Sequence, residues 1–354
     1  MRSPIAHSAP LTAIARVALL TLATACATLF ATAHAAPIPL LNIDRTQTTV
    51  SGVSSGGYMA VQLHVAYSAR FSKGAAAVTG GPFNCAEGSL IKALTRCMGK
   101  MSIPVPELVA ATNQWAKDGE IDATSNLGAS KVYLFAAAND SVVKEGTTTS
   151  LFDYYKTYVN PANIVMKTDV KSEHGFLTDD YGTACGSKDM PFITNCNFDL
   201  AGAILKHLYG DLTPRKSGLL DGSLVEFDQT TFVAGNGMGT TGWVYVPKTC
   251  SSGASCRLHV ALHGCKQNVA EVGQQFVRNT GYNRWADTNN IVVLYPQTGK
   301  GATNGCWDWW GYDDANYAKK SAPQMKAIVA MMDRLASGST TPVSASTAKP
   351  SAAK

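Results

Sequence analysis

Short apolar runs alternate with helical patterns through most of the chain. Runs rich in β-branched and aliphatic residues predict five strands, at 48–50, 131–135, 163–166, 258–262 and 291–295. Helices are expected over 58–69 and over 324–335, and in the second of these apolar residues recur at a spacing of three and four. This alternation of strands and helices predicts an α/β sheet protein with a single folded domain over 36–337.

The two ends of the chain have patterns of their own. Residues 1–35 contain Arg2 and Arg16, no acidic residue, an apolar stretch over 17–30 and a small-residue cleavage site at 33–35, which predicts a secretory signal peptide. The apolar stretch is shorter than the roughly 20 residues that a membrane span needs. Lipoprotein processing at Cys26 is an alternative. From 338 to 354 the chain is rich in Ser, Thr, Pro and Ala, and we expect a disordered tail there.

Composition excludes one class of partner. The 354 residues are 45% hydrophobic and 16% charged, and 30 Lys and Arg against 25 Asp and Glu give a net charge of +5. The basic residues are scattered, without the long run or patch that binds nucleic acid. We therefore expect no nucleic-acid partner. The predicted signal peptide indicates secretion to the extracellular space or the periplasm. We also expect the protein to be a monomer.

Cysteine usage fits an oxidising compartment. Removal of a signal peptide takes Cys26 from the nine cysteines and leaves an even number, which favours disulfides. None of the remaining cysteines forms a C-x-x-C pair, so no metal site is expected. Eight cysteines allow roughly a hundred pairings. The simplest hypothesis joins near neighbours, as Cys85–Cys97, Cys185–Cys196 and Cys250–Cys256, and leaves Cys265 with Cys306.

A G-x-S-x-G motif at 52–56 lies between a predicted strand and a predicted helix. In a nucleophile elbow, this context places the serine on a sharp turn, where its hydroxyl is exposed and the next N–H points at the developing oxyanion. The motif therefore predicts Ser54 as a nucleophile and the backbone N–H of Ser55 as an oxyanion donor.

A serine nucleophile needs a base and an orienting carboxylate. His174 follows a predicted strand in a loop and is the preferred base, whereas His64 and His207 fall in helical patterns and His259 lies within a strand. Asp140 follows the strand at 131–135 and is the preferred acid.

Asp179 and Asp180 are the alternative acids, but they lie too near His174 in sequence to come from a separate strand end. The resulting order, serine then aspartate then histidine, is that of α/β-hydrolases.

One segment departs from the usual α/β-hydrolase order. His263-Gly264-Cys265 follows a buried strand as an oxyanion loop does, but it comes after the other catalytic residues instead of before the serine. We infer a circularly permuted α/β-hydrolase with the Cys265 N–H as the second oxyanion donor. A Cys265–Cys306 bridge would hold that donor in place.

Three of the six tryptophans occur together, at Trp307, Trp309 and Trp310. Aromatic faces suit a hydrophobic ester, and core packing is the alternative. A bridge from Cys306 to the oxyanion loop would place this segment beside the site.

Five segments carry a resemblance to a known family, at 51–59 (SGVSSGGYM), 80–85 (GGPFNC), 195–199 (NCNFD), 258–265 (LHVALHGC) and 279–287 (NTGYNRWAD). Together they resemble the extracellular poly(3-hydroxybutyrate) depolymerases with a permuted catalytic domain, especially the single-domain fungal type. The resemblance covers about 40–335.

The resemblance implies hydrolysis of short-chain polyhydroxyalkanoate esters by Ser54, Asp140 and His174 without a cofactor, with Ser55 and Cys265 as oxyanion donors. It also implies four disulfides and a substrate crevice lined by Trp309, and we assign Trp307 and Tyr58 to the same substrate site.

Two other functions stay open at this point. One is a general carboxylesterase that acts on soluble feruloyl or acetyl esters. The other is a non-catalytic surface-binding protein that has kept the fold.

Overall fold

The computed structural model describes residues 35–232 and 236–338. The predicted signal peptide and tail, but for one residue of each, lie outside the described residues. Within these residues no helix is long and apolar enough to cross a membrane.

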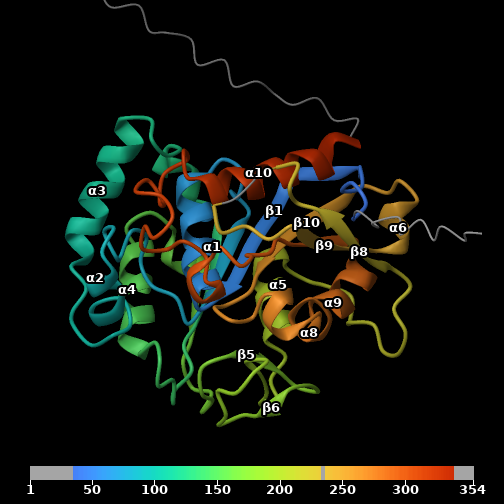
Figure 1. Ribbon diagram of the computed structural model, residues 1–354, viewed down its shortest axis with the longest axis horizontal. Helices are drawn as coiled ribbons and strands as arrows, with labels where there is room; N and C mark the ends of the chain where they lie inside the picture. The colour runs from blue at the N-terminus through green and yellow to red at the C-terminus, as the bar shows by residue number, and fades with distance from the viewer. Residues whose placement is uncertain (1–34, 233–235, 339–354) are drawn as a thin grey trace, which may run out of the picture. The chain divides into compact units, whose positions relative to one another are not determined.

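An eight-stranded sheet forms the centre of the fold, in the order β4-β3-β2-β1-β10-β11-β9-β8 (Figure 1). Its strands are β1 (Ile43–Val53), β2 (Gly74–Val78), β3 (Lys131–Phe135), β4 (Ile164–Lys167), β8 (Ser223–Asp228), β9 (Thr241–Val246), β10 (Cys256–Leu262) and β11 (Ile291–Tyr295). The six strands from β4 to β11 pair in parallel, and β9 pairs antiparallel with both β11 and β8. A small second sheet contains β5 (Phe176–Thr178), β7 (Ile193–Asn195) and β6 (Thr183–Ala184).

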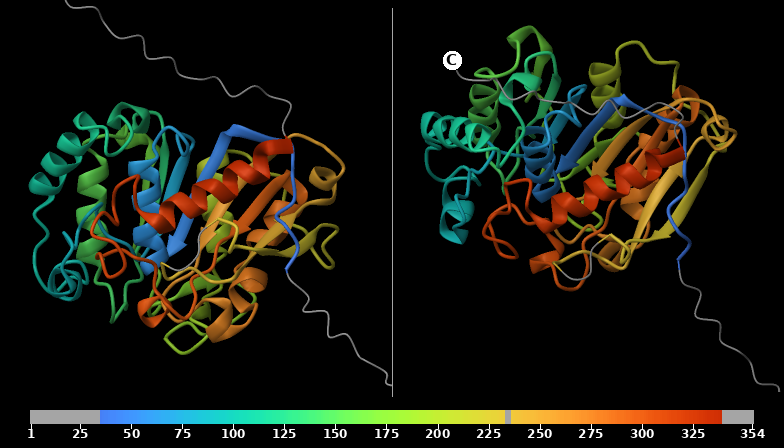
Figure 2. Two further views of the ribbon diagram at one scale, coloured as in Figure 1. Left: turned by 45° about the horizontal axis from the view of Figure 1, so that its top comes forward. Right: turned by 90° about the horizontal axis from the view of Figure 1, so that it is seen from above.

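Helices cover both faces of the large sheet (Figure 2). One apolar core joins the sheet to α1 (Ser55–Ala66), α3 (Val105–Lys117), α4 (Glu145–Tyr155) and α10 (Pro323–Leu335). The other joins it to α5 (Leu200–Tyr209), α8 (Gln275–Asn279) and α9 (Tyr282–Asn289). Alternate residues of one strand enter opposite cores, as Val292 and Val293 do. Burial on both faces explains why β11 (IVVLY) is apolar along its whole length.

Three further helices are short: α2 (Leu90–Thr95), α6 (Lys248–Ser251) and α7 (Val269–Val272). Four disulfides join Cys85 to Cys97, Cys185 to Cys196, Cys250 to Cys256 and Cys265 to Cys306. These are the pairs proposed from the sequence.

The order of the strands explains how distant segments meet. β10 lies directly beside β1 although about two hundred residues separate them, and Gly52 is paired with Leu262 at their carboxyl ends. The loop that follows β10 therefore starts next to Ser54. The α/β sheet is confirmed, and the circular permutation, which would account for this late strand beside an early one, stays a prediction.

Differences from the predicted elements have local causes. The first helix begins at Ser55, three residues before the predicted start, because glycines 56 and 57 are helical. The strand β2 was not predicted, since its sequence GAAAV lacks the β-branched run that signals a strand. The antiparallel strands β8 and β9 were missed as well.

Candidate active site

Ser54 occupies a sharp turn between β1 and α1. Its φ of 55° and ψ of −122° are unusual for a residue with a side chain, and such strain is typical of a nucleophile elbow. Its N–H donates to the carbonyl oxygen of Val78 at 2.9 Å, which ties the turn to β2.

Glycine is needed on both sides of this turn for steric reasons. A Cβ at Gly52 would lie 2.1 Å from the carbonyl oxygen of Gly56. A Cβ at Gly56 would lie 2.4 Å from the carbonyl oxygen of His263. The motif therefore permits the helix to start in direct contact with both its own strand and the end of β10.

Asp140 and His174 meet at the carboxyl edge of the sheet. The Nδ1 atom of His174 lies 2.8 Å from Oδ2 of Asp140. The other carboxylate oxygen accepts the N–H groups of Val142 and Val143, both at 2.8 Å. Both side chains are buried, and His174 lines the same cavity as Ser54. The hydrogen bonds from Val142 and Val143 thus fix the orientation of the Asp140 carboxylate toward the His174 imidazole.

The other candidates lie elsewhere. Asp179 pairs with Arg215 and Asp180 with Arg284, so neither is the partner of His174. Three histidines have structural partners: His64 contacts the Tyr155 hydroxyl, His207 the carbonyl oxygen of Asn163, and His259 the hydroxyls of Thr49 and Ser51.

The two candidate oxyanion donors, Ser55 and Cys265, lie on two segments next to Ser54. Ser55 is the first residue of α1, where backbone N–H groups have no partner within the helix. Cys265 lines the cavity beside Ser54, and the neighbouring Gly264 donates its N–H to Oε1 of Gln267 at 2.8 Å.

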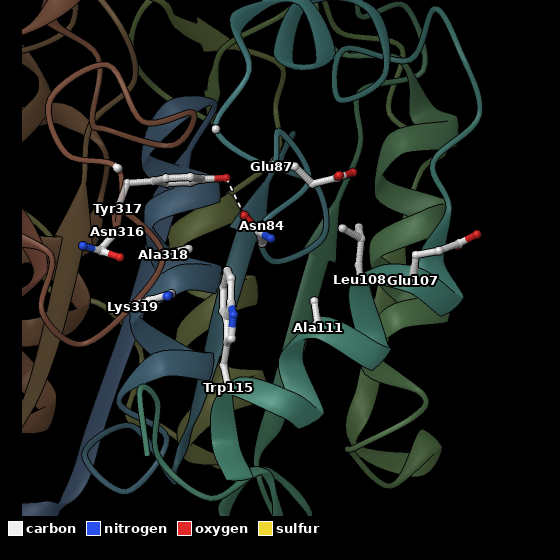
Figure 3. A pocket seen from close by; sticks show the side chains of 12 residues that line it. Asn84, Glu87, Glu107, Leu108, Ala111, Trp115, Asn316, Tyr317, Ala318 and Lys319 are labelled. Atoms are coloured by element: carbon white, nitrogen blue, oxygen red, sulfur yellow. Dashed lines mark hydrogen bonds between the residues drawn. The ribbon is translucent and has the colours of Figure 1, made fainter. Parts of the chain in front are cut away.

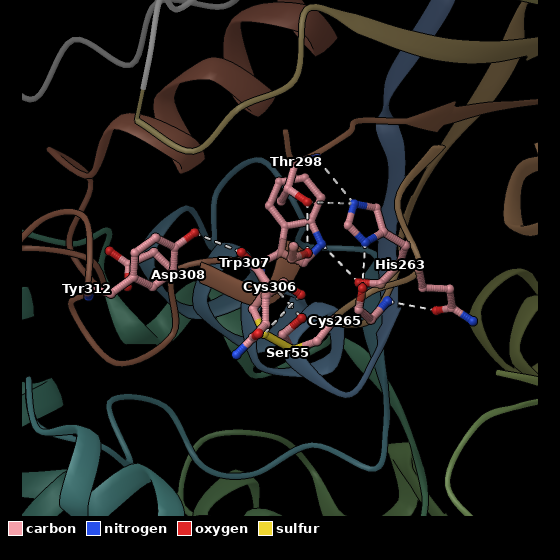
Figure 4. The surroundings of a disulfide bond; sticks show 12 residues. Ser55, His263, Cys265, Thr298, Cys306, Trp307, Asp308 and Tyr312 are labelled. Atoms are coloured by element: carbon pink, nitrogen blue, oxygen red, sulfur yellow. Dashed lines mark hydrogen bonds between the residues drawn. A yellow bond between two sulfur atoms is a disulfide. The ribbon is translucent and has the colours of Figure 1, made fainter. Parts of the chain in front are cut away.

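His263 holds the loop after β10 in one conformation (Figure 4). Its Nδ1 lies 2.7 Å from the carbonyl oxygen of Gly264, and its Nε2 accepts the Thr298 N–H at 3.2 Å. Burial lowers the pKa of His263 to about 4, so the ring is neutral at pH 7. These two contacts require the tautomer with a proton on Nδ1, which donates to Gly264.

Trp307 corrects one prediction. We assigned it to the substrate site, but its side chain is fully buried and does not line the cavity. The indole N–H donates to the carbonyl oxygen of His263 at 2.9 Å, and the ring packs against the His263 ring. Trp307 therefore supports the loop after β10 from behind, because Cys306 bonds to Cys265 and the next side chain points into the core (Figure 4).

A mostly apolar cavity of about 620 Å³ opens above Ser54 and His174. Tyr58 and Trp309 form one wall as a stacked pair, with ring centroids 4.2 Å apart, and Trp310 continues it. The Tyr58 hydroxyl donates to the carbonyl oxygen of Cys97. The lining also includes Val142, Val143 and Phe192, and α2 contributes Leu90 and Leu94.

The turn that presents the tryptophans is built on a buried carboxylate. Oδ1 of Asp308 accepts the N–H groups of Gly311 and Tyr312 at 2.7 and 3.0 Å, and Oδ2 accepts those of Asp313 and Asp314 at 3.2 and 3.0 Å. Trp309 and Trp310 lie inside this turn, so its four hydrogen bonds fix their backbone.

A second cavity, of about 310 Å³, lies between α3 and the 315–319 segment (Figure 3). Trp115 stands in it, and the Tyr317 hydroxyl donates to Oδ1 of Asn84 at 2.7 Å. It shares no lining residue with the cavity above Ser54. Among the described residues, no three His, Cys, Asp or Glu side chains are grouped to hold a metal ion.

Comparisons with known proteins show which family the chain belongs to. The family described as "Esterase PHB depolymerase" matches residues 243–341. A polyhydroxybutyrate depolymerase of Talaromyces funiculosus is 41% identical over 323 residues, which cover 86% of this chain and 94% of that protein. The chain belongs to the polyhydroxybutyrate depolymerase family.

Other members of the depolymerase family match over a similar range. A poly(3-hydroxybutyrate) depolymerase of Delftia acidovorans is 61% identical over 316 residues, 87% of this chain, and the chain spans only 64% of the length of that relative. The crystal structure of the depolymerase from Penicillium funiculosum superposes with a TM-score of 0.80 at 39% identity and covers 86% of this chain and 99% of that one. A PHB depolymerase with a serine-to-alanine substitution, complexed with an R3HB trimer, gives 0.81 at 38% identity, with the same coverage.

Several residues that line the cavity above Ser54 were not identified from the sequence. Leu90, Leu94 and Met98 belong to or follow α2, and no chemical motif marks them. The only signal was the Cys85–Cys97 pair, because Leu90 and Leu94 lie between these cysteines and Met98 directly follows the second. The bridge folds this segment back beside Tyr58.

Proposed function

We propose that this chain is a secreted serine esterase that hydrolyses the ester bonds of poly(3-hydroxybutyrate) or related short-chain polyhydroxyalkanoates. The observation that carries the proposal is the cavity that Ser54 and His174 both line, with Asp140 hydrogen-bonded to Nδ1 of the imidazole. The family relationship supports the same substrate class.

The proposed mechanism uses the residues at the cavity floor. The hydrogen bond to Asp140 keeps a proton on Nδ1 of His174, so Nε2 is free to take the Ser54 proton as the hydroxyl oxygen attacks the ester carbonyl. The N–H groups of Ser55 and Cys265 stabilise the oxyanion of the tetrahedral intermediate, a contribution of about 2.7–4 kcal/mol for each donor. His174 then protonates the leaving alcohol. In the second half of the reaction His174 takes a proton from the water that attacks the acyl carbon, and it gives this proton to the Ser54 oxygen as the hydroxy acid is released.

An apolar rim beside the cavity favours a polymer, and not a soluble ester, as the substrate. Leu90, Ile91 and Leu94 of α2 and the nearby Met101 are large apolar residues that are exposed by 54, 75, 46 and 61%. Two of them, Leu90 and Leu94, also line the cavity, so the rim is continuous with the catalytic site. Contiguous apolar surface of this kind favours contact with a hydrophobic solid.

The domain organisation and location belong to the same proposal. Residues 1–35 act as a signal peptide, 36–337 form the catalytic domain, and 338–354 are a tail. The four disulfides are consistent with an oxidising, extracellular compartment. The protein acts as a monomer without a cofactor, with Tyr58 and Trp309 binding the acyl or alcohol side of the ester.

A parallel assay tests the function. Purified protein is incubated with amorphous poly(3-hydroxybutyrate) film and, separately, with short p-nitrophenyl esters, and the soluble products of the film are analysed. We expect release of 3-hydroxybutyrate monomer and oligomers together with ester turnover. Ester turnover without film erosion would favour the general carboxylesterase, and absence of both would favour a non-catalytic binding protein.

A further inference from the structure

Glu173 connects the loop of the candidate acid to the loop of the candidate base. Its Oε1 atom accepts the Ser141 N–H at 2.7 Å and the His174 N–H at 2.8 Å. Ser141 directly follows Asp140 in the chain. We propose that Glu173 is a positioning residue, which sets the distance between the Asp140 carboxylate and the His174 imidazole through these two hydrogen bonds. This inference rests on the proposed function.

The two loops run side by side before they reach Glu173. The N–H groups of Ala136, Ala138 and Asn139 donate to carbonyl oxygens of the 167–172 segment: Lys167 at 3.0 Å, Val170 at 2.9 Å and Ser172 at 3.2 Å. Main-chain contacts thus extend the β3–β4 pairing beyond both strands. Further along the chain, the Ser141 N–H donates to the side chain of Glu173 and not to a main-chain carbonyl oxygen.

The contact between Ser141 and Glu173 lies next to the Asp140 carboxylate and the His174 imidazole, whose distance it affects. The N–H groups of Val142 and Val143 are taken by Asp140 itself, so they fix the carboxylate only relative to its own turn. Glu173 links this turn to the base directly, since one of its oxygens accepts the N–H of Ser141 and that of His174.

The backbone of Glu173 has an independent anchor. Its N–H donates to the carbonyl oxygen of Cys185 at 3.0 Å, and Cys185 is bonded to Cys196. The side chain therefore extends from a fixed point.

The protonation state of Glu173 suits this role. Partial burial raises its pKa, but the hydrogen bonds from Ser141 and His174 and the charge of Lys188 together lower the pKa below its usual value. The carboxylate is thus charged at neutral pH, and hydrogen bonds to a charged acceptor are the strong ones.

Three variants of Glu173 test the proposal. Gln keeps an oxygen that can accept both N–H groups, Met has a similar shape but no acceptor, and Ala removes the side chain. For a soluble p-nitrophenyl ester we expect Glu173→Met and Glu173→Ala to lower kcat about 10- to 100-fold with KM within about threefold, because small displacements of catalytic groups cost this much. Glu173→Gln should stay within about threefold of wild type. Glu107→Ala, at an exposed glutamate outside the catalytic cavity, is the control and should not change kcat.

The outcomes are distinguishable. Equal kcat for wild type and all three variants would overturn the proposal, and so would an equal loss in the Gln and Met variants, since that points to charge and not to hydrogen bonds. Thermal unfolding of each variant identifies any that fails to fold, and either Met or Ala can then serve for the comparison. If wild type turns over no ester and Ser54 is not labelled by a fluorophosphonate, it is the proposed function that fails.

Discussion

Gly56 and His263 are in contact across the start of α1 and the end of β10, at a distance that leaves no room for a side chain. A Cβ at position 56 would lie 2.4 Å from the His263 carbonyl oxygen and 2.5 Å from that of Leu262. The nucleophile turn and the loop after β10 are therefore fixed relative to each other by main-chain contact. Together with the pairing of β1 and β10, this contact joins two parts of the site that lie far apart in the chain.

Gly56→Ala should separate the two segments. We expect kcat/KM for a soluble ester to fall at least about 100-fold, since a displacement of about 1 Å can cost that much, and we expect a clear loss of thermal stability. Gly146→Ala is the matched control, because a Cβ there meets nothing within 4 Å and the glycine lies in α4. It should leave activity unchanged and stabilise the fold by roughly 0.5–1 kcal/mol. Wild-type activity in Gly56→Ala would contradict the contact.

The Cys265–Cys306 bridge should matter for turnover as well as for stability. It closes a loop with a sequence separation of 41 residues, and loss of such a loop costs about 3–4 kcal/mol. If it also holds the Cys265 N–H, the double variant Cys265→Ala/Cys306→Ala should lose at least about tenfold in kcat at a temperature where it is still folded. The control is Cys250→Ala/Cys256→Ala, whose bridge lies outside the cavity and should leave kcat within about twofold. An equal effect of both pairs on kcat would show that the first bridge is only a structural link.

The apolar rim predicts a separation between polymer and soluble substrates. Ile91 is exposed by 75% and does not line the cavity, so Ile91→Ser should weaken adsorption to a polyester film several-fold and leave p-nitrophenyl ester turnover unchanged. Leu219, exposed by 91% and also outside the cavity, is the matched control, and Leu219→Ser should alter neither quantity. Binding to film is measured by depletion of protein from solution. The same adsorption in all three proteins would contradict a role for α2.

Buried histidines predict a loss of stability in acid. Burial lowers the pKa of His64 and His259 to about 3 and that of His263 to about 4, whereas a histidine in an unfolded chain titrates near pH 6.5. Below pH 6.5 the unfolded chain therefore binds protons that the folded protein does not, and the free energy of unfolding falls as the pH falls toward 4.

Between pH 7.0 and pH 4.5 this effect amounts to about 2.5 kcal/mol for each histidine. Urea unfolding at pH 7.0 and 4.5 measures it, and His64→Gln should reduce the difference by the share of one histidine. A free energy of unfolding that is the same at both pH values would contradict the buried, neutral state of these rings.

The sequence predicted the parts of the site that depend on local patterns. Ser54 could be chosen because the G-x-S-x-G motif lies between a predicted strand and a predicted helix, which is a local pattern. Asp140 and His174 could be chosen because each follows a predicted strand. The strand β2 escaped prediction since alanines fill it, and its assignment depends on neighbours on both sides.

Properties that depend on tertiary packing could not be predicted in this way. Nothing local distinguishes Trp307 from Trp309, yet the first is buried behind the His263 loop and the second stacks on Tyr58 in the cavity. The role of Glu173 depends on two loops that meet only in the folded sheet. The apolar residues of α2 likewise became part of the cavity only through the fold of the 85–97 segment.

The most direct test of the account is the Ser54→Ala variant on amorphous poly(3-hydroxybutyrate). The purified variant and wild type, shown to have equal thermal stability and equal film adsorption, are compared for release of soluble 3-hydroxybutyrate products. The account predicts a fall in product release of at least about 10⁴-fold, because the variant lacks the attacking oxygen. Product release near the wild-type rate would contradict the assignment of Ser54 as the nucleophile, and with it the proposed mechanism.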